Sequence, residues 1–295
     1  MISVLIPVYN TNVRALVNRV QHLLEASVRD YQIIVIDDGS DDPASKAENH
    51  QLHELINVSY IESSENVGRS RIRNKLMKLA RYENLIFLDC DVRIDNEDFI
   101  SNYLKHLDKP VVCGGIDYEQ KAPEAGRLLH WKIGRQKEAL SAKKRNKSFP
   151  PILFTANFMV KADVLNSAYF DENIEGYGYE DVAWAYDLFR KQIKIFHIDN
   201  PVVHTGLSDN ASFLTKTKQA LQNLTMLSDQ GKIGKTPLIK YVTLVDKIPL
   251  FRRLFITVEK HMENKLLNDK GGSILFDLWK MAHLLQIQSV KEDQH

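Results

Sequence analysis

The sequence predicts an α/β domain built on a mostly parallel sheet with helices on both faces, followed by a helical extension. Through residues 1–210, short and almost continuously apolar runs alternate with segments of helical periodicity. Strands that are buried on both faces of a parallel sheet have this pattern. After residue 210 the runs give way to helical patterns with scattered lysine and arginine. We therefore expect a domain over residues 1–210 and an extension over residues 211–295.

The expected elements of the domain follow in chain order. Residues 2–6 form a β-branched run that Pro7 ends, and Thr11 can cap a helix whose apolar positions recur at i, i+3, i+4 and i+7. Residues 33–36 are a buried type of strand, followed by an Asp-Gly turn. Further strands are expected over 57–61, 85–88 and 201–204, and a helix over 69–81.

Composition excludes several classes of protein. Of the 295 residues, 44% are hydrophobic and 26% charged, which is ordinary for a globular chain and excludes a disordered or collagen-like one. Two cysteines, Cys90 and Cys113, are too few for a disulfide framework or a zinc site. No apolar stretch is long enough for a transmembrane helix, and the N-terminus lacks the basic region of a secretory signal. We expect a cytoplasmic protein with reduced thiols.

The net charge of +1 conceals an uneven distribution. Its small size gives no reason to expect a nucleic-acid partner. By segment the formal charge is −4 over 1–60, 0 over 61–110, +5 over 111–150, −5 over 151–210 and +5 over 211–295. The charges are therefore blocked along the chain, and each block needs its own explanation.

Polar residues follow the expected strands at the edge where parallel sheets bind ligands. Pro7 and Tyr9 follow the first strand, where the G-x-G-x-x-G turn of a dinucleotide-binding fold is absent. Tyr9 stacks on a base or packs under the loop. After the second strand, Asp37 and Asp38 accept from a nucleobase ring N–H or form an Asp-Gly turn with a helix cap.

Two more positions carry candidate metal ligands. Asp89 and Asp91 end the strand over 85–88, and residues i and i+2 of an extended chain point the same way. Both carboxylates can therefore face one divalent cation, the alternative being a solvated loop. His204, at the end of the strand over 201–204, is either a structural histidine or a ligand of the same metal.

A carboxylate pair opens a later helix. Glu180 and Asp181 follow the glycine-containing residues 176–179 and lie where a helix dipole favours negative charge. Helix capping is one interpretation. The other is a general base held rigidly beside an acceptor hydroxyl.

Five motifs stand in order along the first two thirds of the chain. They are residues 3–10, residues 37–40, Asn66-x-Gly68-x-Ser70-x-x-Arg73-Asn74, Asp89-x-Asp91 and Glu180-Asp181. In their order and approximate spacing they resemble the nucleotide-sugar glycosyltransferases of family 2, which have the GT-A fold. The resemblance covers roughly residues 1–206. The stretch 176–181 and His204 resemble the bacterial polysaccharide-polymerase and galactosyltransferase-like branch.

The resemblance implies a GT-A fold and a metal-dependent, inverting glycosyltransferase. The donor would be a UDP-hexose or UDP-N-acetylhexosamine, and the acceptor a hydroxyl of a saccharide or lipid-linked molecule in surface polysaccharide synthesis. Asp181 would be the catalytic base with Glu180 beside it, and Asp91 would bind Mn²⁺ or Mg²⁺ with Asp89 and His204. The nucleotide-sugar-binding residues would be Pro7, Tyr9, Asp37, Asp38, Asn66, Gly68, Arg73, Asp89 and Arg135.

The two basic segments and the function class keep alternatives. The segment around Trp131 and Arg135 is a solvated helix face or a mobile segment that contacts donor diphosphate or an anionic acceptor. The extension packs on the catalytic domain or makes peripheral contact with an anionic membrane. One competing function is a non-catalytic sugar-nucleotide-binding subunit of another glycosyltransferase. A nucleotidyltransferase is the other, but it needs a glycine-rich basic loop after the first strand.

Overall fold

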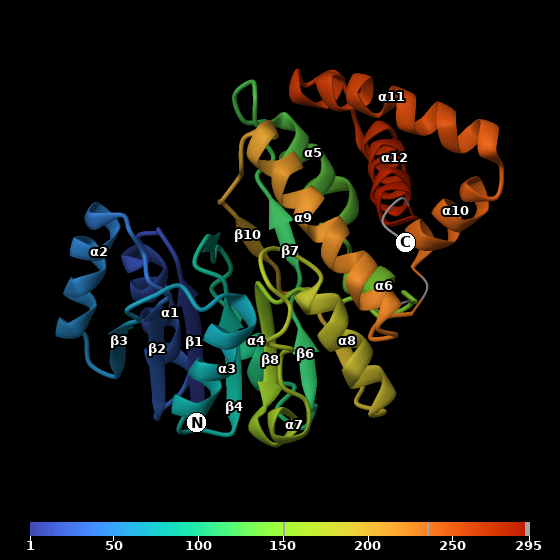
Figure 1. The fold of residues 1–295 in the computed structure, drawn as a ribbon. Helices are drawn as coiled ribbons and strands as arrows, with labels where there is room; N and C mark the ends of the chain where they lie inside the picture. The colour runs from blue at the N-terminus through green and yellow to red at the C-terminus, as the bar shows by residue number, and fades with distance from the viewer. Residues whose placement is uncertain (150, 235, 293–295) are drawn as a thin grey trace. The chain divides into compact units, whose positions relative to one another are not determined.

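The computed structural model describes residues 1–149, 151–234 and 236–292, which fold into two compact units (Figure 1). The first unit takes residues 1–119, 139–175 and 180–206. The second takes residues 120–138, 176–179 and those from 207 onward. The domain boundary predicted at residue 210 stays a prediction.

The first unit is built on a seven-stranded sheet, in the order β3-β2-β1-β4-β8-β6-β9 (Figure 1). All neighbouring strands are parallel except β8, which runs antiparallel to both β4 and β6. The predicted mostly parallel sheet is thus confirmed. The strands are β1 Ile2–Val8, β2 Tyr31–Asp37, β3 Val58–Glu62, β4 Asn84–Leu88, β6 Val111–Cys113, β8 Asn157–Lys161 and β9 Ile195–His197.

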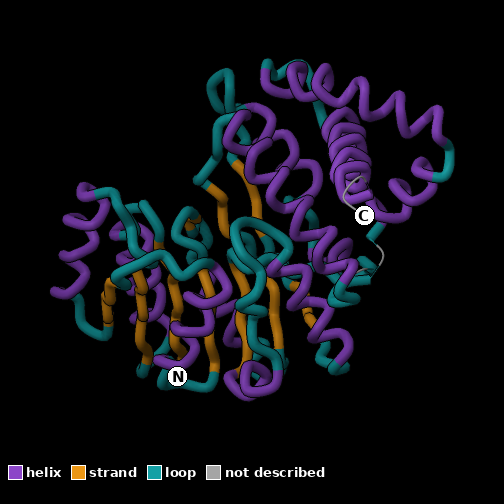
Figure 2. The backbone as a smooth tube through the Cα atoms, viewed as in Figure 1, coloured by secondary structure: helices purple, strands orange, loops and turns teal. Residues whose placement is uncertain are grey.

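Helices cover both faces of this sheet, as the ribbon and tube views show (Figure 2). Apolar side chains of α1 (Arg14–Ser27) and α4 (Phe99–Leu104) share one buried cluster with β1 and β2. A second buried cluster is formed by the strand side chains that point to the opposite face of the sheet, together with apolar side chains of α3, α7 and α8. The remaining helices of this unit are α2 Pro43–His50, the 3₁₀ helix η1 Gln51–Glu54, α3 Arg69–Leu79, α6 Ala142–Arg145, α7 Ala162–Ser167 and α8 Glu180–Arg190.

A small three-stranded sheet adjoins the candidate site. Its order is β5-β10-β7, from Val92–Arg93, Val202–His204 and Ile116–Tyr118. In the antiparallel pairing of β10 with β5, His204 lies opposite Val92. This register brings His204 next to the residue that precedes Val92, which is Asp91.

Two local details differ from the sequence-based expectation. The first strand continues past Pro7 to Val8. Beyond Leu5 it pairs only with β2, so on its other side there is no strand to which the missing N–H of Pro7 would have donated. The predicted cap at Thr11 is wrong. The N-cap position of α1 is Val13, whose N–H donates to the side chain of Asn49 at 2.9 Å, and the N–H of Arg14 donates to Asn12 Oδ1 at 3.0 Å.

The second unit is helical, as predicted for the extension. The same unit contains α5, which comes from the basic segment around Arg135. In the interior of the unit, the buried indole N–H of Trp279 donates to Glu259 Oε1 at 3.0 Å. Its helices are α5 Leu128–Lys137, α9 Asn210–Asp229, α10 Pro237–Asp246, α11 Pro249–Leu267 and α12 Ser273–Glu292. Its core is formed by Leu129, Ile133, Leu214, Met262, Leu266, Phe276, Trp279 and Ala282. Across the described parts of the chain, no helix has the length and apolarity to cross a membrane.

Candidate active site

Six residues singled out from the sequence line one cavity of the first unit. It opens at the carboxyl ends of β1 and β4 and at the start of α3, where a parallel sheet is expected to bind its ligand. Tyr9, at the cavity, keeps 46% of its surface exposed and is free to meet a ring. The lining is Pro7, Val8, Tyr9, Asp38, Arg69, Ile72, Arg73, Asp89, Cys90 and Asp91.

The two adjacent aspartates after β2 serve different parts of the chain. Asp37 is buried and accepts from the Ser40 N–H at 2.7 Å and from the Tyr60 hydroxyl at 3.2 Å. Asp38 accepts from the backbone N–H groups of Val67 and Gly68 at 2.9 and 3.0 Å. Since these bonds fix the loop that leads into α3, Asp38 positions the cavity wall on which Arg69 and Arg73 lie.

Arg73 joins two of the predicted carboxylates. Its side chain is 2% exposed, and Nη2 donates to Asp89 Oδ1 at 2.9 Å. Nη1 lies 3.4 Å from Glu180 Oε1, which Arg69 Nη1 also approaches, at 3.3 Å. Within the part of the chain described, Arg73 Nε is a buried donor without a partner. The geometry therefore makes Arg73 the link between β4 and α8.

The environment of Glu180 keeps it ionised. Burial raises the pKa of this carboxyl, but the positive charges of Arg69 and Arg73 outweigh burial and hold the pKa below its ordinary value. The side chain is 5% exposed. A carboxylate with two guanidinium partners is a poor proton acceptor, and these contacts hold the Arg73 side chain. A catalytic role for Glu180 stays a prediction.

Asp91 and His204 form a pair at the same edge. His204 Nδ1 lies 3.5 Å from Asp91 Oδ1. Burial raises the pKa of Asp91, while the hydrogen bond and charge of His204, with the charge of Arg69, bring it below its usual value. The loop after β10 packs closely here, since a Cβ on Gly206 would lie 2.3 Å from Asp91 Oδ2.

The Asp91 carboxylate and the His204 imidazole fit a divalent cation that a bound diphosphate also coordinates. A carboxylate and an imidazole suit Mn²⁺, and carboxylate oxygen suits Mg²⁺. Asp89 is close in sequence to Asp91, but one of its oxygens already accepts from Arg73. Among the residues described, no group of three or more His, Cys, Asp or Glu side chains stands ready to enclose a metal. The protein would therefore supply only some of the ligands, leaving the others to a diphosphate and water.

Asp181 lies in the first turn of α8, directly after Glu180. It is half-buried, and its Oδ1 accepts from the Val182 N–H at 2.7 Å. Glu180 and Asp181 therefore lie in different surroundings. The first faces two arginines, and the second remains at the helix start, where its role as a base stays a prediction.

The comparison with protein families decides the family. Residues 3–165, more than half of the chain, match Glycosyl transferase family 2. The chain belongs to this family. Its residues at the ends of β1, β2 and β4, together with Asn66, Gly68 and Arg73, all lie inside the matched range.

Curated relatives of this family 2 chain are similar over parts of their length. The chain is 27% identical to Glycosyltransferase GlyG of Streptococcus pneumoniae over 116 residues, 39% of this chain and 38% of the relative. It is 33% identical to Poly(ribitol-phosphate) beta-glucosyltransferase of Bacillus spizizenii over 124 residues, 39% of this chain and 19% of the relative. It thus spans well under half the length of these relatives.

A solved structure shares the fold of this family 2 chain. The mannosyltransferase PcManGT from Pyrobaculum calidifontis, solved with GDP-Man and Mn²⁺, superposes with a TM-score of 0.60 at 15% identity. The match covers 98% of this chain and 86% of that one. The GT-A fold predicted from the motifs is therefore confirmed.

The structure leaves four predicted nucleotide-sugar contacts apart from the cavity lining. Asp37 is buried and bonds Ser40 and Tyr60. Asn66 is exposed on the loop before α3, and Gly68 forms the N-terminal end of that helix with φ +89°. Arg135 belongs to the second unit, where it donates to the carbonyl and side chain of Gln120 at 3.0 Å and lies over the Trp131 ring. Their contacts with a donor stay predictions.

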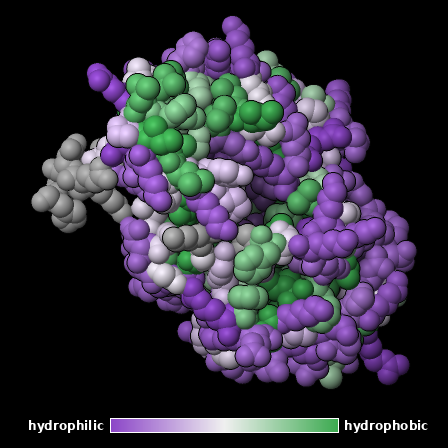
Figure 3. Space-filling model, turned by 90° about the vertical axis from the view of Figure 1, so that its right-hand side faces the viewer, coloured by the Kyte–Doolittle hydropathy of each residue, from purple (hydrophilic) through white to green (hydrophobic). Residues whose placement is uncertain are grey.

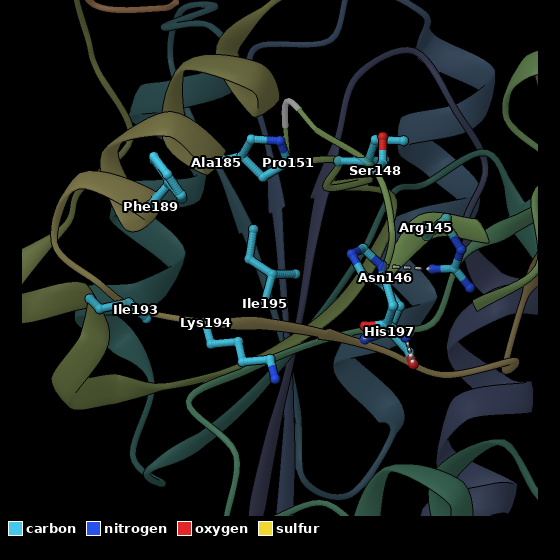
Figure 4. Close-up of a pocket in the computed structure, with 11 residues that line it drawn as sticks. Arg145, Asn146, Ser148, Pro151, Ala185, Phe189, Ile193, Lys194, Ile195 and His197 are labelled. Carbon is cyan, nitrogen blue, oxygen red and sulfur yellow. Dashed lines mark hydrogen bonds between the residues drawn. The ribbon is translucent and has the colours of Figure 1, made fainter. Parts of the chain in front are cut away.

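Another cavity of the first unit, of about 140 Å³, lies between α6, α8 and β9 (Figure 4). Its polar groups are engaged by the fold. Burial and the charge of Arg145 lower the pKa of His197 to about 4, so the ring is neutral and can accept from Arg145 Nη1 at 3.2 Å. Arg145 is buried and donates to the carbonyls of Cys113, Gly114, Leu140 and Ile198. None of the predicted site residues lines this cavity.

Sequence reasoning missed two parts of the family 2 site. Arg69 lines the cavity and pairs with Glu180, and its position one residue after Gly68 at a helix start was the available signal. Gly206 leaves room for the Asp91 side chain, because a Cβ at this position would lie 2.3 Å from Asp91 Oδ2. A single glycine after His204 carried no comparable signal, since only the register of β10 brings it to the site.

Proposed function

We propose that the chain catalyses metal-dependent, inverting transfer of a sugar from a nucleotide-sugar donor to a hydroxyl of a saccharide or lipid-linked acceptor. The observation that carries the proposal is the convergence of Tyr9, Asp89 and Asp91 on one cavity, with His204 3.5 Å from Asp91. Membership of family 2 supports the reaction class.

For the donor we propose a UDP-linked hexose or N-acetylhexosamine, and for the process surface polysaccharide synthesis. Two relatives support this choice by their names, Poly(ribitol-phosphate) beta-glucosyltransferase and the Chondroitin synthase of Escherichia coli. A panel of nucleotide sugars tests it directly. The correct donor should raise the melting temperature most at equal concentration, because ligand stabilises the native state according to its concentration over Kd.

In the proposed mechanism each residue has one task. Asp181 accepts the proton of the acceptor hydroxyl, whose oxygen attacks the anomeric carbon on the face opposite the departing diphosphate, so the configuration inverts. Asp91 and His204, with Asp89, would hold the cation. When bound, that cation would offset the charge that develops on the leaving diphosphate. Arg73 keeps Asp89 and Glu180 in place.

Asp181→Asn tests the base. Turnover should fall by about 10²–10⁴-fold, while donor binding measured by calorimetry with Mn²⁺ remains, because only proton transfer is removed. Asp187→Asn is the matched control. Asp187 lies on the same helix, pairs with Lys191 at 2.6 Å and should leave turnover unchanged.

The outcomes separate the alternatives. Near-normal turnover in Asp181→Asn would contradict the assignment of the base. A wild-type protein that binds one donor tightly but turns over none, with any acceptor tried, would favour the non-catalytic subunit. Metal-dependent donor binding that survives Asp91→Ala would exclude Asp91 as a ligand.

A further inference from the structure

The second unit exposes an unusual concentration of apolar side chains. Of the sixteen large apolar side chains that are exposed in the described residues, six fall within residues 241–254, at the junction of α10 and α11. Figure 3 views the side that carries these helices and shows apolar residues gathered on it. We call this the α10–α11 patch, and it consists of Tyr241, Leu244, Ile248, Leu250, Phe251 and Leu254.

The patch follows helical spacing. Tyr241 and Leu244 are three residues apart on α10, and Leu250 and Leu254 are four apart on α11, so each pair shares a helix face. Further along α11, Met262 and Leu266 are buried in the core of the unit. The helix is therefore anchored at one end and presents apolar residues at the other.

The segment that carries the patch has a net positive charge. Residues 237–255 contain four basic residues and one acid. The acid, Asp246, pairs with Arg252 at 3.2 Å. In the described chain no ion pair involves the other three cations. They are Lys240, Lys247 and Arg253, all exposed.

We propose that the α10–α11 patch docks the protein on an anionic phospholipid surface. The apolar side chains are 47–78% exposed, so they project from the surface and do not line a groove of the kind that grips a peptide. Projecting leucine, phenylalanine and tyrosine with lysine and arginine at their edge match the boundary between acyl chains and acidic headgroups. The proposal is independent of the donor and of the catalytic base.

Vesicle sedimentation tests the proposal with the full chain. The protein should sediment with vesicles of equal parts phosphatidylglycerol and phosphatidylcholine, and much less with phosphatidylcholine alone. Neutralising Lys247 and Arg253 by Lys247→Gln and Arg253→Gln should weaken binding about fivefold per charge. Added salt should weaken it further, because exposed charges are screened.

The apolar part of the patch has a close control. Leu250→Glu with Leu254→Glu should lower the partition coefficient at least tenfold, since two apolar side chains are replaced by anions. Ile274→Glu should not. Ile274 is 78% exposed, as Leu250 is, and lies at the start of α12. The hydrogen bond between α12 and Arg252 of α11 is made near the other end of α12, by Ser289.

Three results would overturn the proposal. The first is wild-type protein that stays in the supernatant with the anionic vesicles. The second is equal loss of binding in the Leu250/Leu254 and Ile274 variants. The third is light scattering that shows a dimer in the wild type and a monomer only in the Leu250/Leu254 variant, without vesicle binding, which would assign the patch to a second copy. Turnover with a water-soluble acceptor should be the same in all these variants, so failure here leaves the proposed function testable.

Discussion

Replacing Glu180 by glutamine tests whether charge holds the link between β4 and α8. Glu180 Oε1 lies 3.3 Å from Arg69 and 3.4 Å from Arg73, and the side chain is 5% exposed. A hydrogen bond to a charged group contributes about 1.5–3 kcal/mol at good geometry. Removing one partner of a fully buried ion pair costs about 3–5 kcal/mol, but Arg73 retains Asp89 and glutamine retains an acceptor oxygen. We therefore expect the free energy of unfolding to fall by about 2 kcal/mol.

The assay is urea unfolding of the wild type and Glu180→Gln at a series of pH values. Because the folded pKa of Glu180 is below its unfolded value, the stabilisation from its charge is present above the ordinary value of 4.5 and is lost as the pH falls through the folded pKa. Glutamine does not titrate. The difference between the two proteins should therefore be full at neutral pH and shrink on acidification.

The same substitution at an exposed pair is the control. Glu97 contacts Arg19 at 2.7 Å with 74% of its side chain exposed, and Glu97→Gln should leave the urea midpoint unchanged. A Glu180→Gln protein that is as stable as the wild type at neutral pH would refute the reasoning. So would a difference that does not change with pH, because that would assign the effect to shape and not to charge.

Two further substitutions probe the close packing at Asp91 and the buried histidine of the other cavity, His197. Gly206→Ala places a methyl group 2.3 Å from Asp91 Oδ2 and should weaken Mn²⁺-dependent donor binding, measured by calorimetry, at least tenfold. Gly272→Ala is the control, because its methyl group meets nothing within 4 Å and should leave donor binding unchanged. Unchanged binding in Gly206→Ala would contradict the close packing at Asp91. His197 has a folded pKa of about 4 against 6.5, so it stabilises the fold fully above pH 6.5, and this part, about 3 kcal/mol, is lost as the pH falls towards 4. Urea unfolding should show that His197→Gln removes this pH dependence, and an equal slope in both proteins would count against it.

The sequence predicted the strands that carry the site because they are short, buried and continuously apolar. Asp89 and Asp91 reach the same cavity as Tyr9 because parallel strands expose their carboxyl ends at one edge of the sheet. Strand β8 was not predicted, because residues 157–161 contain only three apolar residues, and this short pattern also gives no sign of its antiparallel direction. The partners of Arg73 were also hidden, since Glu180 lies 107 residues further along the chain.

The charge blocks of the sequence gain a more specific interpretation from the structure. The acidic block over 151–210 contains Glu180, whose charge is compensated by Arg69 and Arg73 of α3. These arginines belong to a different block, residues 61–110, whose net charge is zero. The block charge therefore overstates the negative potential near the site. In the basic block over 211–295, residues 237–255, which carry the α10–α11 patch, contain a single acid, Asp246, and it is already paired with Arg252.

The order of the motifs also has a physical explanation. Asp38 bonds the loop that starts α3, and α3 carries Arg73. Arg73 in turn bonds Asp89 and Glu180, which come from the end of β4 and the start of α8. Four motifs that are weak signals alone are thus consecutive links of one hydrogen-bonded chain across the sheet edge. A substitution at any link should displace the next, so donor binding, metal binding and the position of the base are expected to respond together.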